Sequence, residues 1–250
     1  MTARFLTALT TSLSALLLAA PAVADECVVL LHGLWRTENS MNRMEESLAA
    51  AGYRVRNIEY DSTEKPLEVL AEEAVTAGLR ACDGAATVHF VTHSMGGILV
   101  RQYLEERDID RLGRVVMLGP PNQGSEVIDR YAKWPGFEWF SGPAGLQLGT
   151  GEASVPRALG PARFDLGVIA GNHTINPILS QTLPGADDGK VSVDATRVEG
   201  MTDHLEMPVT HVFMMRDPEV IAQVIHYLQS GHFNRHGGDE TVDGAPADKP

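Results

Sequence analysis

Short apolar runs recur along the chain and predict buried strands. Most of them are continuous, such as the run from Val28 to Leu31, and such runs are typical of strands covered on both faces, as in a parallel sheet. Residues 53–58 instead alternate between apolar and polar positions. The expected strands, in chain order, are residues 28–32, 53–58, 86–92, 113–119, 165–170 and 205–209.

Between these runs, apolar residues return at the spacing of a helix face. Residues 40–51 place Met41, Met44 and Leu48 in this way, and Gly52 ends the pattern. The expected helices are residues 40–51, 66–81, 98–104 and 217–229. Strands that alternate with helices predict an α/β fold with a doubly wound, mainly parallel sheet and right-handed crossovers.

The first 24 residues have the pattern of a secretory signal peptide. Arg4 precedes an apolar stretch at residues 5–20, and a small-x-small pattern ends at Ala24, just before Asp25. We therefore expect cleavage after Ala24 and a periplasmic or extracellular protein. An uncleaved anchor is the alternative, but the stretch is short for a membrane span, and no second run of spanning length follows.

The remaining chain divides into one domain and a tail. An apolar content of 44% is ordinary for a globular protein, so we expect one domain over residues 25–230. Residues 231–250 are rich in Gly, Asp, Pro and His and are expected to be disordered. His232 and His236 lie in this tail, where solvated side chains are a better interpretation than metal ligands.

Residues 120–163 break the alternation of strands and helices. This segment is rich in Gly and Pro and also holds Trp134, Phe137, Trp139 and Phe140. Long loops inside a compact domain are usually functional or disordered, and the aromatic residues argue against disorder. We expect a cap whose aromatic side chains line a pocket; a small satellite core at the sheet edge is the alternative.

The net charge of the chain argues against some classes of partner. The net charge is −13, and loss of Arg4, the only charged residue of the first 24, would make it −14. This argues against nucleic acid and anionic membranes as electrostatic partners.

Cys27 and Cys82 each precede an expected strand, and neighbouring parallel strands would bring them to one end of the sheet. We expect a disulfide; two buried free thiols are the alternative.

The segment from Thr92 to Gly97 carries the strongest chemical signal. It reads Thr-His-Ser-Met-Gly-Gly and lies between an expected strand and an expected helix. A central Ser between small residues at such a turn fits a nucleophile elbow, where close packing forces the Ser into a strained conformation. Thr92 departs from the usual Gly, and we expect its bulk to open the turn slightly. A strand–helix turn without chemistry is the alternative.

A nucleophilic Ser needs an acid and a base, which follow it in the order Ser, Asp, His in one common arrangement. Asp188 is the preferred acid because Gly189 permits a sharp turn after it. Asp187 and Asp194 stay open as alternatives, and Asp-Asp-Gly is also ordinary turn chemistry.

His211 is the preferred base because it lies between the last expected strand and the final helix. His204 is the alternative, although it precedes that strand, and His173 breaks the expected order. His89, within the strand before the Ser, and His226, on the last helix, are expected to have structural roles.

Backbone N–H groups must stabilise the oxyanion of such a reaction. Met95 N–H directly follows the Ser, and Leu34 N–H lies in the loop after the first strand. We expect His32 to brace that loop and His93 to be structural.

Taken together, these segments resemble the lipase and esterase branch of the bacterial α/β-hydrolases. The matching pieces, in the family's order, are residues 31–35 (Leu-His-Gly-Leu-Trp), 93–97, 119–125 (Gly-Pro-Pro-Asn-Gln-Gly-Ser), 188–191 (Asp-Gly-Lys-Val) and 210–211. The resemblance implies an α/β-hydrolase fold with an inserted cap and places the acid on Asp188. Some lipases of this kind hold a structural calcium ion, to which Asp187 and Asp203 could supply oxygens here.

These residues predict a secreted serine hydrolase that cleaves carboxylic esters, from small molecules or lipids, without a cofactor. Transient contact with a lipid surface is compatible with this prediction, and the oligomeric state is left open. An acyltransferase or thioesterase with the same triad, a peptidase, and a catalytically silent binding protein of the same fold are the alternatives.

Overall fold

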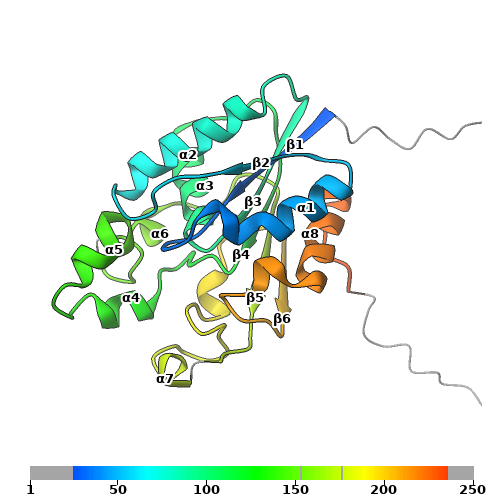
Figure 1. Cartoon of the computed structure of the whole chain (residues 1–250). Coiled ribbons are helices and arrows are strands. Elements are labelled where there is room, and N and C mark those ends of the chain that lie inside the picture. The colour runs from blue at the N-terminus through cyan, green and yellow to red at the C-terminus, as the bar shows by residue number, and fades with distance from the viewer. Residues whose placement is uncertain (1–24, 153, 176, 236–250) are drawn as a thin grey trace, which may run out of the picture.

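Six parallel strands form the centre of the computed structural model, which describes residues 25–152, 154–175 and 177–235 (Figure 1). The sheet order is β2-β1-β3-β4-β5-β6. The order therefore reverses between β1 and β3, and ligand sites of open α/β sheets lie at such a switch point, beyond the carboxyl ends of the strands. The strands are β1 (Glu26–Leu31), β2 (Arg54–Ile58), β3 (Thr87–His93), β4 (Leu112–Leu118), β5 (Leu166–Gly171) and β6 (Asp203–Met207).

Helices cover both faces of the sheet. On one face α2 (Leu67–Ala81) and α3 (Met95–Glu106) pack on the strands. On the other face lie α1 (Asn42–Ala50) and α8 (Pro218–Ser230), in front of the sheet in Figure 1. The doubly wound α/β fold predicted from the sequence is thus confirmed.

The apolar run of β1 shows why both faces must be covered. Val29 and Leu31 belong to the core under α2 and α3, whereas Val28 and Leu30 belong to the core under α1 and α8. Successive side chains of a strand point to opposite faces. A continuous apolar run therefore stabilises the fold only when each face meets a helix.

Most element boundaries agree with the sequence prediction within two residues, but α3 (Met95–Glu106) starts three residues before the expected 98–104 and β6 is also displaced. The last strand covers residues 203–207, two residues earlier than the expected 205–209. Val209 remains buried although it lies beyond the strand, so the apolar pattern follows the core further than the strand extends. His211 consequently follows β6 after a short turn rather than directly.

The remaining helices are short and lie in the loops. Three of them, α4 (Glu126–Tyr131), α5 (Phe137–Leu146) and α6 (Val155–Ala158), belong to the insertion between β4 and β5. In addition, α7 (Pro177–Ser180) follows β5. The single turns η2 (Glu38–Met41), η3 (Asp194–Thr196) and η4 (Met214–Arg216) complete the described chain.

A disulfide joins Cys27 of β1 to Cys82, the residue that ends α2, with their Cα atoms 5.8 Å apart. The predicted pairing is present, and its basis is the sheet order: Cys27 lies opposite Val88 of β3 at the amino end of the sheet.

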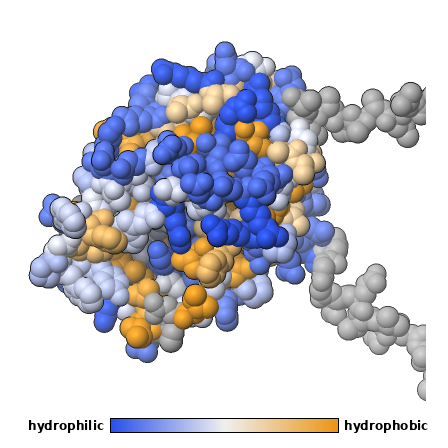
Figure 2. Space-filling view, viewed as in Figure 1, coloured by the Kyte–Doolittle hydropathy of each residue, from blue (hydrophilic) through white to orange (hydrophobic). Residues whose placement is uncertain are grey.

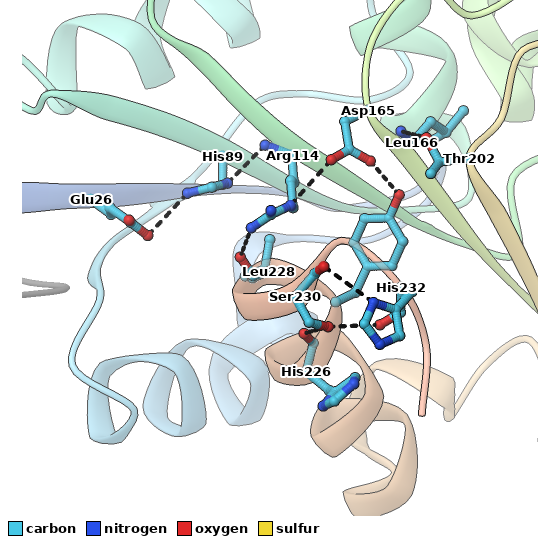
Figure 3. A network of polar contacts seen from close by, with 11 residues as sticks. Glu26, His89, Arg114, Asp165, Leu166, Thr202, His226, Leu228, Ser230 and His232 are labelled. Carbon is cyan, nitrogen blue, oxygen red and sulfur yellow. Dashed lines mark hydrogen bonds and ion pairs between the residues drawn. The ribbon is translucent and has the colours of Figure 1, made fainter. Parts of the chain in front are cut away.

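A polar network lies at the same end of the sheet (Figure 3). His89 of β3 contacts the Glu26 carboxylate at 3.2 Å and accepts a hydrogen bond from Arg114 N–H at 2.8 Å. The Arg114 guanidinium donates to Asp165 at 3.1 Å, and the Tyr227 hydroxyl donates to the other Asp165 oxygen at 2.6 Å. The network ties α8 to β3, β4 and the start of β5, and His89 has the structural role expected of it.

The chain beyond α8 packs on the domain as far as the structure describes it. Phe233 is buried, with its ring centroid 4.8 Å from that of Tyr227, and Arg235 forms an ion pair with Asp203. The packed domain therefore includes residues 231–235, which we expected in the tail. The predicted signal peptide at residues 1–24 and the rest of the predicted tail, at 236–250, lie outside the described residues.

None of the helices in the described part of the chain is long and apolar enough to cross a membrane.

Candidate active site

Ser94 lies on a strained turn between β3 and α3. Its φ of 53° and ψ of −122° are unusual for a residue other than glycine. Gly96 makes the turn possible, because a Cβ atom there would lie 2.6 Å from the Leu31 carbonyl oxygen and 2.8 Å from that of His32. The predicted elbow geometry is therefore present, with Ser94 partly exposed at the end of the central strands.

Thr92, where we expected a bulky side chain to open the turn slightly, lies within β3. It pairs in register with Leu31 of β1 and Met117 of β4. Its side chain is buried, and its hydroxyl has no hydrogen-bond partner among the described residues. Because Thr92 still belongs to the strand and the turn starts after His93, its bulk is accommodated by the sheet.

Ser94, His211 and Asp188 form one chain of hydrogen bonds. Ser94 Oγ lies 3.0 Å from His211 Nε2, and His211 Nδ1 lies 2.7 Å from Asp188 Oδ2. The Asp188 side chain is fully buried, and its other oxygen accepts the N–H groups of Lys190 and Val191. This pattern orients the carboxylate toward Nδ1 and leaves Nε2 to accept the Ser94 hydroxyl proton.

Close backbone packing holds the acid and the base together. Gly119 has a φ of +54°, and a Cβ atom there would lie 3.0 Å from Asp188 Oδ2 and 3.1 Å from His211 Nδ1. The His211 N–H also donates to the Asp188 carbonyl at 2.9 Å. The end of β4 thus leaves the space that the His–Asp pair requires.

His93 fixes the base from the opposite side. Its Nε2–H donates to the His211 carbonyl at 2.9 Å, and the two ring centroids are 4.8 Å apart. Burial lowers the pKa of His93 well below its usual range, and the neighbouring His211 lowers it further. A neutral His93 beside the nucleophile therefore has the structural role that the sequence predicted.

The alternative acids and bases have other partners. Asp187 accepts from the Ser180 hydroxyl and the Gly189 N–H, and the Asp194 side chain is 90% exposed. His204 Nε2 contacts the Thr196 hydroxyl at 2.9 Å, and His173 is exposed. The geometry therefore brings together the three preferred residues and not their alternatives.

The two expected oxyanion donors come from two segments near Ser94: Met95 follows it in the chain, and Leu34 lines the same cleft. Met95 is the first residue of α3, where an N–H has no acceptor within its own helix. Leu34 lies in the turn after β1. The next N–H groups are engaged, because Trp35 donates to Ser62 Oγ and Arg36 donates to the Gly33 carbonyl.

His32 braces this turn, as expected. Its Nδ1–H donates to the Gly33 carbonyl at 3.0 Å. Its ring stacks on Tyr60 with 4.0 Å between centroids, and the Tyr60 hydroxyl donates to the His32 carbonyl.

A cleft of about 540 Å³ opens above Ser94. Its apolar wall comes from Leu34, Val127, Ile128, Leu148 and Val191. Such a wall suits the hydrocarbon part of a ligand, while the polar groups fix its reacting atoms.

The aromatic residues of the insertion do not line this cleft, which corrects our expectation. Trp134, Trp139 and Phe140 are 60%, 91% and 60% exposed. Phe137 and Phe140 pack on Trp35 instead, with ring centroids 6.3 and 5.1 Å away. The insertion contributes smaller residues of α4 to the cleft, because α5 packs outside Trp35.

The oxygens considered for calcium have other partners. Asp203 binds Arg235 and the Phe233 N–H, and Asp187 binds Ser180 and the Gly189 N–H. Among the described residues, no group of three or more His, Cys, Asp or Glu side chains is arranged to hold a metal ion.

Sequence reasoning missed three residues of the cleft, Trp35, Arg36 and Lys190. Trp35 has a φ of 59°, and its ring faces the Lys190 ammonium at 5.3 Å. Trp35 and Lys190 lie inside two of the segments that carry the resemblance, and Arg36 directly follows the first of these segments.

Comparison with known proteins matches residues 28–234 to the alpha/beta hydrolase family. No curated protein matches the chain. Among solved structures, it is similar to the mature lipase BlEst2 of Bacillus licheniformis, with a TM-score of 0.67 and 19% identity over 84% of this chain and 93% of that chain.

Two further solved structures are also similar. The phospholipase PlaB of Legionella pneumophila has a TM-score of 0.62 and 15% identity, covering 83% of this chain and 60% of that one. A metagenomic carboxyl esterase has a TM-score of 0.58 and 21% identity, covering 76% and 66%. At these identities the likeness shows a shared fold.

Proposed function

The chain belongs to the alpha/beta hydrolase family, and from that premise we propose that it is a secreted serine hydrolase that cleaves carboxylic esters. The observation that carries the proposal is the hydrogen-bonded chain from Ser94 through His211 to Asp188 at a strained turn. Ser94 faces a cleft with an apolar wall, which favours an ester with a hydrocarbon part.

The proposed reaction has two steps. Ser94 Oγ attacks the acyl carbon while His211 Nε2 takes its proton, and His211 then gives that proton to the leaving alcohol. Asp188 holds the imidazole in the required tautomer and stabilises its charged form. The N–H groups of Leu34 and Met95 stabilise the oxyanion. Water, activated by His211, then releases the acid and regenerates Ser94.

Two separate features support the proposed export. The sequence has a predicted cleavage site after Ala24, and Cys27 and Cys82 form a disulfide. Disulfides persist in oxidising compartments and are rare in the cytosol. We therefore place the protein in the periplasm or outside the cell.

Exposed apolar side chains support contact with lipid esters. They lie on the insertion and around α7, and Figure 2 shows hydrophobic residues gathered at the lower edge, where Figure 1 places α7. The exposed residues are Trp134, Trp139, Phe140, Ile175 and Ile178. A substrate presented on a lipid surface would meet these side chains first.

The test is hydrolysis of p-nitrophenyl esters from acetate to palmitate by the purified protein. We expect turnover, and we expect Ser94→Ala to lose at least about a hundredfold in kcat/KM. Ser47→Ala, at a partly exposed serine of α1, is the matched control and should retain activity. The dependence of kcat/KM on acyl chain length then indicates the size of the acyl pocket.

Absence of turnover would be examined with a serine-reactive fluorophosphonate probe. Labelling at Ser94 without ester hydrolysis would favour an acyltransferase or thioesterase with the same triad. If the protein shows no labelling and no hydrolysis, this result contradicts the proposal and favours a silent binding protein.

A further inference from the structure

Two positively charged side chains line the cleft of an otherwise acidic chain. The net charge of the protein is −13. The cleft nevertheless presents Arg36 and Lys190, and none of the described residues that line it is an Asp or a Glu. The local charge beside the nucleophile is therefore opposite to that of the whole protein.

The Lys190 ammonium has no carboxylate partner. It is half-buried, and it takes part in none of the ion pairs between described residues. Burial lowers the pKa of Lys190 and the charge of Arg36 lowers it further, while the charge of Asp188 opposes the shift only in part. Because an unpaired charge away from water is costly, this ammonium would be stabilised by an anion that enters the cleft.

The position of Lys190 is fixed by the loop that holds the acid. Its N–H donates to Asp188 Oδ1 at 3.0 Å, and its carbonyl accepts from the Ser125 hydroxyl at 2.9 Å. Its Nζ lies 5.3 Å from the centroid of the Trp35 ring, and the indole N–H of Trp35 donates to the Phe140 carbonyl. The same backbone that orients Asp188 therefore sets where the ammonium lies relative to Ser94.

Arg36 adds a second positive charge from the oxyanion loop. Its N–H closes the turn on the Gly33 carbonyl at 3.2 Å, and its guanidinium forms no ion pair within the described chain. The charges of Arg36 and Lys190 both lower the pKa of His93, the residue before Ser94. Both side chains line the same cleft as Ser94 and His211.

We propose that Lys190 and Arg36 bind an oxyanion group of the substrate, a carboxylate or a phosphate, so that the site prefers esters that carry a negative charge. This inference rests on the proposed ester hydrolysis and adds to it the class of ester. The charge of Asp188 acts on Lys190 without a close ion pair, because the oxygens of Asp188 bind His211 and two backbone N–H groups.

The test compares charged esters with neutral partners of the same length. One pair is 4-nitrophenyl hydrogen adipate and its methyl ester, which places a carboxylate on the acyl side. The other pair is 4-acetoxyphenyl phosphate and its dimethyl ester, which places a phosphate on the alcohol side. We expect the charged member of at least one pair to have about a tenfold higher kcat/KM, and about 0.5 M NaCl to reduce that preference. The responding pair identifies the anion.

Substitutions then assign the preference to the two cations. Lys190→Met and Arg36→Met should each lower kcat/KM for the charged ester by about tenfold, and by much less for its neutral partner. Lys190→Arg should keep most of the preference because it keeps the charge. Lys133→Met, at an exposed lysine between α4 and α5, is the matched control. It should leave kcat/KM unchanged for both esters of the pair. Thermal unfolding of each variant verifies that it is folded.

Two results would overturn the inference while leaving ester hydrolysis intact. One is equal turnover of charged and neutral members by the unmodified protein. The other is an equal loss on both members in Lys190→Met, which would mean that Lys190 only packs on Trp35. Absence of turnover on all four esters, together with no fluorophosphonate labelling of Ser94, would instead reject the proposed function itself.

Discussion

A histidine beside a carboxylate lies at each end of strand β3, His89 within the strand and His211 in the loop after β6, but the two pairs differ in their surroundings. At the amino end His89 contacts Glu26 at 3.2 Å, and its other nitrogen accepts the Arg114 N–H. At the carboxyl end His211 contacts Asp188 at 2.7 Å, and its other nitrogen faces the Ser94 hydroxyl. Both histidines are thus engaged through both ring nitrogens.

The difference lies in what the second nitrogen meets. His89 is bound to a backbone amide that cannot react, within a network that ties α8 to the sheet. His211 meets a hydroxyl held on a strained turn and exposed to a cleft. A His–carboxylate pair therefore stabilises a fold at one end of the sheet and, on our proposal, supports catalysis at the other. The predictions below test this division.

The largest expected effect is on activity at the carboxyl end. Asp188→Asn should lower kcat by about 10⁴-fold, because an amide no longer holds His211 in the tautomer that accepts the Ser94 proton. Glu26→Gln makes the same chemical change at the amino end and should leave kcat within about twofold. Steady-state ester hydrolysis measures both, and similar losses in the two variants would contradict the division.

The next effect is on stability at the amino end. Replacing Cys27 and Cys82 by Ala should lower the free energy of unfolding by about 4 kcal/mol, because the disulfide closes a long loop in the unfolded chain. The two cysteines are 55 positions apart. Urea unfolding measures the loss, and reduction of the unmodified protein separates the effect of the bond from that of the side chains. An unchanged midpoint after reduction would show that the bond contributes nothing.

A smaller loss of stability is expected when one hydrogen bond of the polar network at the amino end of the sheet is removed. Tyr227→Phe removes the hydrogen bond to the partly buried Asp165 and should cost about 2 kcal/mol, with kcat unchanged. Tyr131→Phe on α4 removes a hydroxyl outside the network and should cost less than about 0.5 kcal/mol. Urea unfolding compares the two variants, and a fall in kcat for Tyr227→Phe would link the two ends of the sheet.

The last expected effect, which is small within any one pH unit, concerns pH. Burial lowers the pKa of His204, the second residue of β6, to about 4. The unfolded chain therefore binds a proton near pH 6.5 that the folded protein does not bind until about pH 4. Stability is thus complete above the unfolded pKa and is lost as pH falls through this interval.

The matching experiment measures unfolding free energy at several pH values between these limits. His204→Gln should reduce the slope of the unfolding free energy against pH by at most about 1.4 kcal/mol per pH unit. His226→Gln, at a histidine on the surface side of α8, serves as the comparison. Identical slopes for His204→Gln and the unmodified protein would show that His204 does not contribute.

Local patterns in the sequence were sufficient for the strands and for the turn at Ser94. A continuous apolar run requires cover on both faces, and Gly96 permits an approach to Leu31 and His32 that no side chain allows. The order of Asp188 and His211 after Ser94 was also readable, because each follows a strand. These features depend on neighbours in the chain or on the order of elements.

Features that depend on distant packing were not readable. The exposure of Trp139 follows from the position of α5 outside Trp35, which is a tertiary contact. The meeting of Arg36 and Lys190 joins the first loop to the acid loop, and the total charge of the chain indicated the opposite sign. The end of β6 was misplaced because burial continues to Val209 after strand pairing has ended.

The hydrogen bond between Ser94 and His211 joins residues 117 positions apart. Contacts of such separation form late in folding, since long loops must close before they contribute. A nascent or translocating chain would hold its nucleophile and the strained turn long before the imidazole arrives beyond the edge strand β6. The chemistry would then begin only once the sheet is complete, so the onset of ester hydrolysis during refolding would time the final folding step.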